Sequence, residues 1–198
     1  MENKTKYEEY MKLFLEENSK VNLISKNDER YLWEKHVFDS LAIENFFEKF
    51  DTAKIKTVLD IGTGGGFPSV PIALTYPKLK VTALDSIAKK IRAVQTLKDK
   101  LNIENLEPVC SRVETLDAKF DMITSRAVSS LKNICEYALP KLKKGGYFVA
   151  YKSRKTPQEI EEANSILKKY NAKIVDIIEY SLPLGENHER NLIVILKK

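Results

Sequence analysis

Residues 58–68 have the types and spacing that point most directly to chemistry. In this segment, VLDIGTGGGFP, an apolar run reaches the acid Asp60, and glycines follow at every second position, Gly62, Gly64 and Gly66. Glycine adopts backbone angles closed to other residues and leaves bare peptide groups against which a ligand can lie. The pattern predicts a ligand cradle at the carboxyl end of a first strand, in preference to a glycine-rich connection without a ligand.

The spacing of the glycines distinguishes between two classes of ligand. A dinucleotide loop, G-x-G-x-x-G, needs its third glycine where helix and strand pack closely, and Phe67 occupies that position here. This disfavours an NAD-dependent oxidoreductase. The spacing D-x-G-x-G-x-G instead resembles the first motif of Rossmann-like S-adenosylmethionine (AdoMet) methyltransferases, whose cofactor has no phosphate. The resemblance implies AdoMet bound at Asp60, Gly62 and Gly64, and no metal.

The rest of the chain must supply the elements that position this loop. We expect an N-terminal helical arm over residues 1–52 and an AdoMet-dependent methyltransferase domain over 53–198. In the second part, strands alternate with amphipathic helices, which predicts a mostly parallel sheet with helices on both faces. The resemblance adds a seven-stranded class I fold with an antiparallel last strand. Strands are expected near 56–61, 80–85, 107–110, 120–125, 147–151, 173–180 and 191–196, and helices near 69–76, 87–101, 129–139 and 157–170.

Polar residues follow the strands at the sheet edge where open α/β folds bind ligands. Asp85 ends the second strand, and an acid there can accept hydrogen bonds from both ribose hydroxyls. Asp85 or Ser86 could equally cap the next helix. After the fifth strand, Lys152, Arg154 and Lys155 bring three cations to this edge. We expect them to contact RNA, against the alternative that they form only a solvated surface.

Taken together, these pieces resemble the ribosomal RNA small-subunit methyltransferase G family, also called glucose-inhibited division protein B. The matching pieces are Asn22-Leu23, His36-Val37-Phe38-Asp39-Ser40-Leu41, Asp60 to Pro68, Leu84-Asp85-Ser86, Arg112-Val113-Glu114 and Thr124-Ser125-Arg126-Ala127. They span nearly the whole chain in family order. The resemblance implies methyl transfer from AdoMet to N7 of a guanine in the 530 loop of 16S rRNA. It implies AdoMet contacts at Gly62, Phe67, Val113, Glu114 and Arg126.

The chain departs from the family pattern at three places. Ser69 stands where glycine is usual, Lys90 where arginine is usual, and Lys152-Ser153 where Lys-Gly is usual. These departures concern the details of RNA contact more than the cofactor. The alternative within the same fold is an AdoMet-dependent methyltransferase that acts on another RNA site, a protein or a small molecule.

The residue inventory agrees with guanine N7 as the acceptor. N7 carries a lone pair in the neutral base, so its methylation requires no catalytic base, and alignment of the reactants supplies the rate. We expect Arg126 to have a positioning role in this alignment. The Asn/Asp-Pro-Pro-Tyr motif of exocyclic-amine enzymes is absent after the fourth strand, and neither Cys110 nor Cys135 lies in the Pro-Cys motif of pyrimidine C5 enzymes.

The cluster His36, Asp39 and Ser40 invites comparison with a hydrolase. Their spacing on one predicted helix gives them a common face, but a Ser–His–Asp relay needs separate elements. No G-x-S-x-G is present. We interpret His36 as a packing residue between arm and body, with an RNA contact as the alternative.

The charge distribution and the composition restrict the kinds of partner and location expected for this protein. Residues 1–50 contain 8 basic and 11 acidic side chains, whereas residues 51–198 contain 25 and 17. A basic body fits a polyanion such as the 16S rRNA of the small ribosomal subunit, although plain solubility explains it too. A non-enzymatic RNA-binding module would leave the glycine loop unexplained. With two separate cysteines, no apolar membrane span and no apolar signal region, we expect a cytoplasmic monomer.

Overall fold

The computed structural model describes residues 4–153, 156–185 and 188–198, and one seven-stranded sheet forms its centre. The strand order is β3-β2-β1-β4-β5-β7-β6. β1 to β5 pair in parallel, and β7 runs antiparallel to both β5 and β6. The strands are β1 (Thr57–Ile61), β2 (Lys80–Asp85), β3 (Leu106–Cys110), β4 (Phe120–Arg126), β5 (Leu142–Ser153), β6 (Ala172–Ser181) and β7 (Glu189–Lys197). The predicted Rossmann-like sheet with an antiparallel last strand is confirmed.

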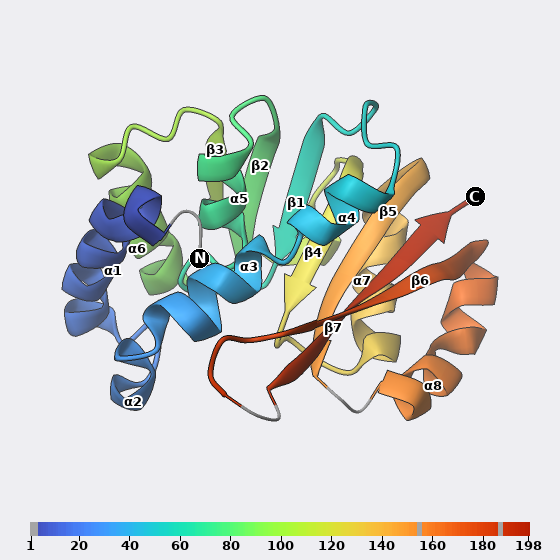
Figure 1. Ribbon diagram of the computed structural model, residues 1–198. Coiled ribbons are helices and arrows are strands. Elements are labelled where there is room, and N and C mark those ends of the chain that lie inside the picture. The colour runs from blue at the N-terminus through green and yellow to red at the C-terminus, as the bar shows by residue number, and fades with distance from the viewer. Residues whose placement is uncertain (1–3, 154–155, 186–187) are drawn as a thin grey trace.

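Each face of the sheet has its own core because successive strand residues point to opposite sides. Val58 packs toward the arm, α5 and α6, whereas Leu59 packs toward α7 and α8. Helices therefore cover both faces, as predicted. Figure 1 shows α5 in front of the strands and α7 behind them. These helices are α5 (Ser69–Thr75), α6 (Ala88–Lys100), α7 (Leu131–Lys141) and α8 (Thr156–Lys169).

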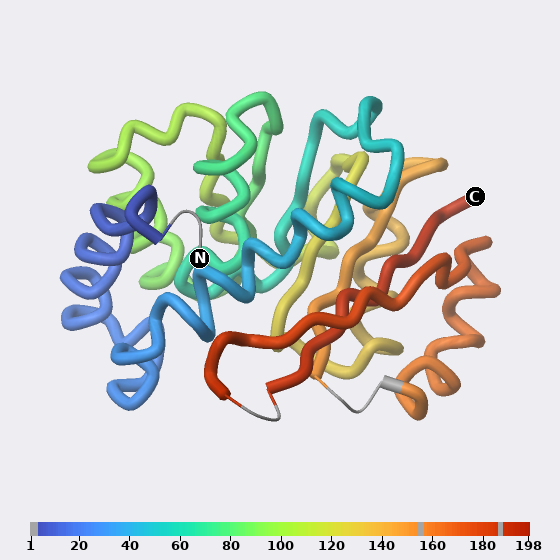
Figure 2. Tube along the Cα trace, in the orientation of Figure 1, coloured from blue at the N-terminus to red at the C-terminus, as the bar shows by residue number. Residues whose placement is uncertain are grey.

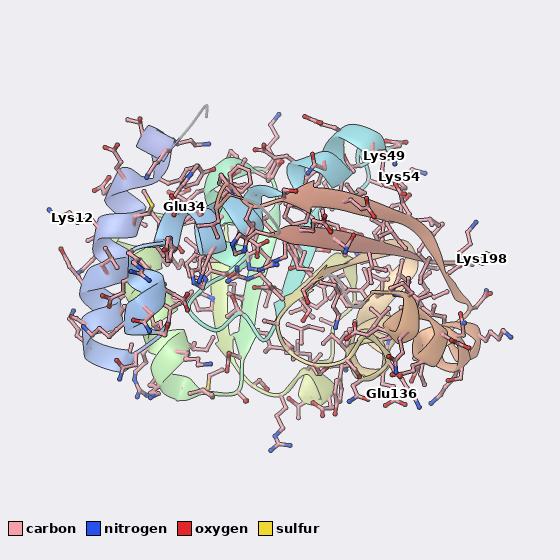
Figure 3. All side chains as sticks on the ribbon, turned by 60° about the horizontal axis from the view of Figure 1, so that its bottom comes forward. Lys12, Glu34, Lys49, Lys54, Glu136 and Lys198 are labelled. Carbon is pink, nitrogen blue, oxygen red and sulfur yellow. The ribbon has the colours of Figure 1, made fainter. Side chains whose placement is uncertain are left out.

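The N-terminal arm packs along the first face and shares its core. Its elements are η1 (Lys4–Tyr7), α1 (Glu8–Val21), α2 (Lys26–Glu29), η2 (Trp33–Phe38), α3 (Asp39–Leu41) and α4 (Glu44–Lys49). The trace in Figure 2 runs from α1 beside α6 to α4 in front of the central strands. Tyr10, Phe14 and Phe46 are fully buried in the same cluster as Val58. At the end of the arm, Lys49, labelled in Figure 3, pairs with Asp176 on β6 at 2.6 Å.

Three local predictions are corrected. A Gly-Gly pair after Leu-Lys-Lys predicts a turn before the fifth strand, but Gly145-Gly146 lies within β5 at a register irregularity against β4. A Cβ on Gly146 would come within 2.7 Å of the Asp121 carbonyl oxygen, so a close approach of backbones requires this glycine. The Asn27-Asp28 pair predicts a turn before the next helix, but it lies in α2, which Ser25 caps. The expected regular helix around His36 is the π-helix η2.

Among the described residues, no helix combines the length and apolar character needed to cross a membrane. In the same residues no group of three or more His, Cys, Asp or Glu side chains could hold a metal ion.

Asp121, at the start of β4, ties the amino ends of β1, β4 and β5 together. Its Oδ2 accepts hydrogen bonds from the backbone N–H groups of Lys56 and Thr57 and from the Thr57 hydroxyl, and Lys143 donates to Oδ1 at 2.8 Å. Partial burial opposes ionisation of Asp121, but the hydrogen bonds from Lys143, Thr57 and the backbone outweigh it and lower the pKa to about 2. The ionised carboxylate is therefore part of the fold.

We expect Asp121→Asn to destabilise the protein by about 2 kcal/mol at pH 7. Because the folded pKa lies below the unfolded value, this contribution is complete above pH 4 and is lost as pH falls toward 2. Urea unfolding at pH 7 and near pH 2 measures the difference between variant and wild type. Asp117→Asn, at an exposed carboxylate, is the control. If the difference in unfolding free energy between Asp121→Asn and wild type is the same at both pH values, the ionised carboxylate does not stabilise the fold.

Candidate functional site

The glycines of the loop after β1 allow its backbone conformation. Gly62, Gly64 and Gly66 have φ angles of 72°, 58° and 95°, a region that side chains with a Cβ rarely adopt. Beneath the loop, the buried Asp60 accepts from the Thr124 hydroxyl at 2.9 Å and from the Ser69 N–H at 3.3 Å. Burial raises the pKa of Asp60 to about 6. Asp60 thus supports the loop from below and does not line a cleft.

The backbone donors of this loop are largely consumed within the protein. The N–H groups of Gly62 and Thr63 bond to the Leu84 carbonyl, and those of Gly66 and Phe67 bond to the Thr63 carbonyl. The Gly64 N–H donates to Asp85 at 3.0 Å. A diphosphate needs converging free N–H groups, and these five are already bonded. The geometry therefore disfavours a ligand that binds this loop through phosphates.

A first cleft of about 410 Å³, called here the cofactor cleft, opens beside the loop. It brings together four residues that the sequence analysis selected: Gly62, Asp85, Val113 and Glu114. Asp85 also accepts from the Ile87 N–H at 2.9 Å, which closes a turn just before α6. The helix-cap alternative is wrong for both Asp85 and Ser86, since no side chain caps the first turn of α6. Each carboxylate oxygen of Asp85 retains a lone pair, so Asp85 can still accept hydrogen bonds from a ligand.

Two further residues shape the walls of the cofactor cleft. The short helix η3 (Val113–Thr115) is held by Lys141, whose ammonium group donates to the Glu114 and Leu116 carbonyls. Opposite, Val128 lies directly on Gly62: a Cβ at Gly62 would meet a methyl group of Val128 at 2.5 Å. Close packing by Val128 is thus one reason why this position is glycine.

A second cleft of about 490 Å³, called here the acceptor cleft, adjoins the first, and Ala127 lines both. Arg126 is its central residue. The guanidinium NH1 donates to the Lys35 carbonyl and to Asp39, both at 2.9 Å, while NH2 lies 3.0 Å from Nδ1 of His36. The same group lies 5.2 Å from the centre of the Phe67 ring. Arg126 therefore joins the arm to the glycine loop.

His36 is held neutral in this arrangement. Burial, reinforced by the charge of Arg126, lowers the pKa of His36 to about 4. Its ring packs against Phe67 with 5.1 Å between the ring centres. His36 thus packs between arm and body, as expected, and it also lines the acceptor cleft.

The predicted site residues consequently fall into three groups. The first group lines the cofactor cleft and consists of Gly62, Asp85, Val113 and Glu114. The second group lines the acceptor cleft and consists of His36, Arg126 and Lys152. The third group, Asp60, Gly64 and Phe67, lines neither, although Gly64 bonds to Asp85. Phe67 is buried against Tyr10 and Phe14 of the arm.

The predicted cations after β5 are described only in part. Lys152 donates to the Ser129 carbonyl at 2.6 Å and pairs with Glu159 at 2.9 Å, and its side chain is 14% exposed. Its contact with RNA stays a prediction. Arg154 and Lys155 lie outside the described residues. A larger hollow of about 750 Å³ between α8 and the β6–β7 pair shares Arg190 with the acceptor cleft but contains none of the predicted residues.

Sequence reasoning missed three residues that shape the site. Val128 directly follows the Ser-Arg-Ala piece, so its position was visible although its contact was not. Tyr180 donates to Asp39 at 2.6 Å and Tyr151 donates to the Ser40 carbonyl at 2.8 Å. These tyrosines reach the arm from strands more than a hundred residues later in the chain, and no local signal predicts such contacts.

A side chain can be added at Gly64 without a steric clash, so this position tests whether the glycine loop binds the cofactor. We expect Gly64→Val to abolish AdoMet binding, because a β-branched side chain resists the positive φ and would fill open space beside Asp85. Gly145→Val is the matched control: Gly145 also has positive φ, 77°, and open space, but it lies at the opposite edge of the sheet. Each variant should lose about 1–2 kcal/mol of stability in urea unfolding. Calorimetry measures the affinity of each variant for AdoMet. Equal affinities in the two variants would refute the assignment of the glycine loop as the AdoMet cradle.

Comparison with known proteins places this geometry in a family. The family model described as rRNA small subunit methyltransferase G (GidB) matches residues 3–193. The ribosomal RNA small subunit methyltransferase G of Staphylococcus saprophyticus is 38% identical over 197 residues, covering 97% of this chain and 81% of that protein. The protein of the same name from Bacillus licheniformis is 37% identical over 198 residues, with coverages of 97% and 81%.

Solved structures agree at the level of the fold. The ribosomal protein L11 methylase from Lactobacillus delbrueckii subsp. bulgaricus matches with a TM-score of 0.59 at 17% identity, covering 81% of this chain and 76% of that one. P. horikoshii TYW2 in complex with MeSAdo matches with a TM-score of 0.61 at 17% identity, covering 81% and 61%. The extent and identity of the sequence matches, on a class I methyltransferase sheet with its glycine loop after β1, show that this chain belongs to the rRNA small subunit methyltransferase G family.

Proposed function

We propose that this protein transfers a methyl group from AdoMet to N7 of a guanine in the 530 loop of 16S rRNA, acting on the small ribosomal subunit as a cytoplasmic monomer. The relatives' names support an rRNA substrate. The choice of N7 rests on one observation: the acceptor cleft contains no free base among the described residues.

The acids of the acceptor cleft are all engaged. Asp39 accepts from Arg126 and Tyr180, and Glu159 pairs with Lys152. Asp28 pairs with Lys35 at 2.7 Å, and hydrogen bonds from Lys35 and Ser25 lower the pKa of Asp28. Asp28 is therefore a poor proton acceptor because its ionised form is stabilised, and Asp39 and Glu159 already face their own donors.

The remaining candidate base and the cysteines are also unsuited to proton removal or covalent catalysis. His36 has a pKa of about 4, and its Nδ1 faces the guanidinium of Arg126. Cys110 is exposed at the end of β3 and Cys135 is buried in α7, and neither lines the two clefts. An exocyclic amine must lose a proton during methylation and pyrimidine C5 requires a nucleophile, whereas guanine N7 requires neither. The inventory therefore favours N7.

The cofactor cleft supports AdoMet as the donor. Asp85 faces the cleft with two carboxylate oxygens that can accept ribose hydroxyls. Apolar side chains offer a surface for an adenine ring; they are Leu84, Ile87, Val113, Val128, Ile134 and Tyr137. When bound, AdoMet supplies an electrophilic methyl group. The chain's own task is to align an acceptor nitrogen with that group across Ala127, which both clefts share.

The acceptor cleft has a charge balance that suits RNA. Its cations are Lys35, Arg126, Lys152 and Arg190, and its acids are Asp28, Asp39 and Glu159. The excess of one cation near the sheet edge, on a body rich in Lys and Arg, favours a phosphate backbone. We assign Arg126 a positioning role, which it performs by holding the arm against the glycine loop.

Ligand-induced stabilisation tests the cofactor. We expect AdoMet, at a hundred times its dissociation constant, to stabilise the protein by about 2.7 kcal/mol, because the five bonded loop donors suit a ligand without phosphate. NAD at the same concentration should leave the unfolding midpoint unchanged. Stabilisation by NAD, with none by AdoMet or S-adenosylhomocysteine, would overturn the cofactor assignment.

Strand scission tests the product. Methylation at N7 makes the guanine cationic, so borohydride and aniline should cleave rRNA at one position in wild-type cells and not in a deletion strain. In complemented cells, Arg126→Ala should reduce scission about tenfold or more, the scale of losing charged hydrogen bonds worth ~1.5–3 kcal/mol each. Arg92→Ala, at an exposed position on α6, is the control and should leave scission intact. Scission that persists in the deletion strain would refute the proposal.

A further inference from the structure

His36 carries an unpaired hydrogen-bond donor. Arginine can only donate, so the short contact between Arg126 NH2 and His36 Nδ1 makes Nδ1 the acceptor. The ring proton is therefore on Nε2. Nε2 is buried and has no partner among the described residues. Arg126 thus sets the tautomer of His36, and the Nε2–H group is left without a hydrogen-bond acceptor.

An unpaired buried donor destabilises the protein, and no acceptor among the described residues relieves the one on His36. The carboxylates of the acceptor cleft, which His36 lines, are bound to Arg126, Tyr180, Lys35 and Lys152. The neighbouring ring on its other side is Phe67, which offers no acceptor. Binding energy is therefore available to a ligand that brings an acceptor atom to Nε2.

We propose that the Nε2–H of His36 donates a hydrogen bond to O6 of the target guanine and so selects guanine over adenine. This inference rests on the function proposed above and deepens it. O6 lies next to N7 on the same edge of the base, whereas adenine presents an amino group at the corresponding place. A fixed donor at His36 pairs with the guanine oxygen and opposes the adenine amine.

Modified substrates test this contact without altering the protein. Small ribosomal subunits are prepared with guanine, inosine or 2-aminopurine at the target position, and transfer of labelled methyl groups is followed in a single turnover. All three bases keep N7, but 2-aminopurine lacks O6 and inosine retains it. We expect transfer to 2-aminopurine to be about tenfold slower than to guanine, the scale of one lost hydrogen bond. Transfer to inosine should match guanine.

Two matched variants separate the two nitrogens of His36. In His36→Asn, the amide oxygen takes the place of Nδ1 and keeps the partner of Arg126, but the Nε2 donor is lost. In His36→Gln, the amide nitrogen takes the place of Nε2 and keeps the donor. Both lose the ring that packs on Phe67. We expect the Asn variant to treat guanine and 2-aminopurine alike, and the Gln variant to retain the roughly tenfold preference.

The outcomes are distinguishable. Equal rates of wild-type protein on guanine and 2-aminopurine overturn the inference, and so does an undiminished preference in the Asn variant. Either result, with N7 methylation of guanine intact, leaves the proposed function standing. Absence of any N7 methylation by wild-type protein overturns the proposed function and this inference with it. If the Asn variant does not fold, as judged by its thermal unfolding, the wild-type substrate comparison still decides.

Discussion

The guanidinium group of Arg126 is the contact on which the arrangement of both clefts depends. It stands at the carboxyl end of β4, bonds to a carbonyl and a carboxylate of the arm, and stacks on Phe67 of the glycine loop. A partly buried charge is tolerated only when it is paired and hydrogen-bonded. The arm supplies this pairing through Asp39, and it is therefore part of the site as well as of the core.

The guanidinium group of Arg126 also influences the charge and protonation of its neighbours in the acceptor cleft. Burial, together with the charge of Arg126, disfavours a positive charge on His36, so the ring stays neutral and its proton is confined to one nitrogen. The acids that face the acceptor cleft are likewise fixed by cations. Within the part of the chain that the structure describes, this site has donors and cations but no free base, which suits an acceptor that needs orientation and not activation.

The glycine loop illustrates how one motif serves several purposes. Gly64 faces open space, whereas Gly62 admits Val128 and Gly65 admits the arm, since a Cβ at Gly65 would lie 3.0 Å from the Phe14 ring. Only part of the motif is therefore free for a ligand. Asp60 and Phe67 belong to the support of the loop, one below it and the other against the arm.

The sequence by itself determined the elements and the place of the site. Alternating apolar runs fix the strands, and parallel strands bring Asp85, Val113 and Arg126 to one edge because their carboxyl ends coincide. What only the tertiary structure decided is which neighbours these residues have. The division into two clefts, the pairing of Arg126 with the arm and the tautomer of His36 depend on side chains about ninety residues apart. Local periodicity reports which face of an element is buried, and it contains no information on which distant charge will meet it.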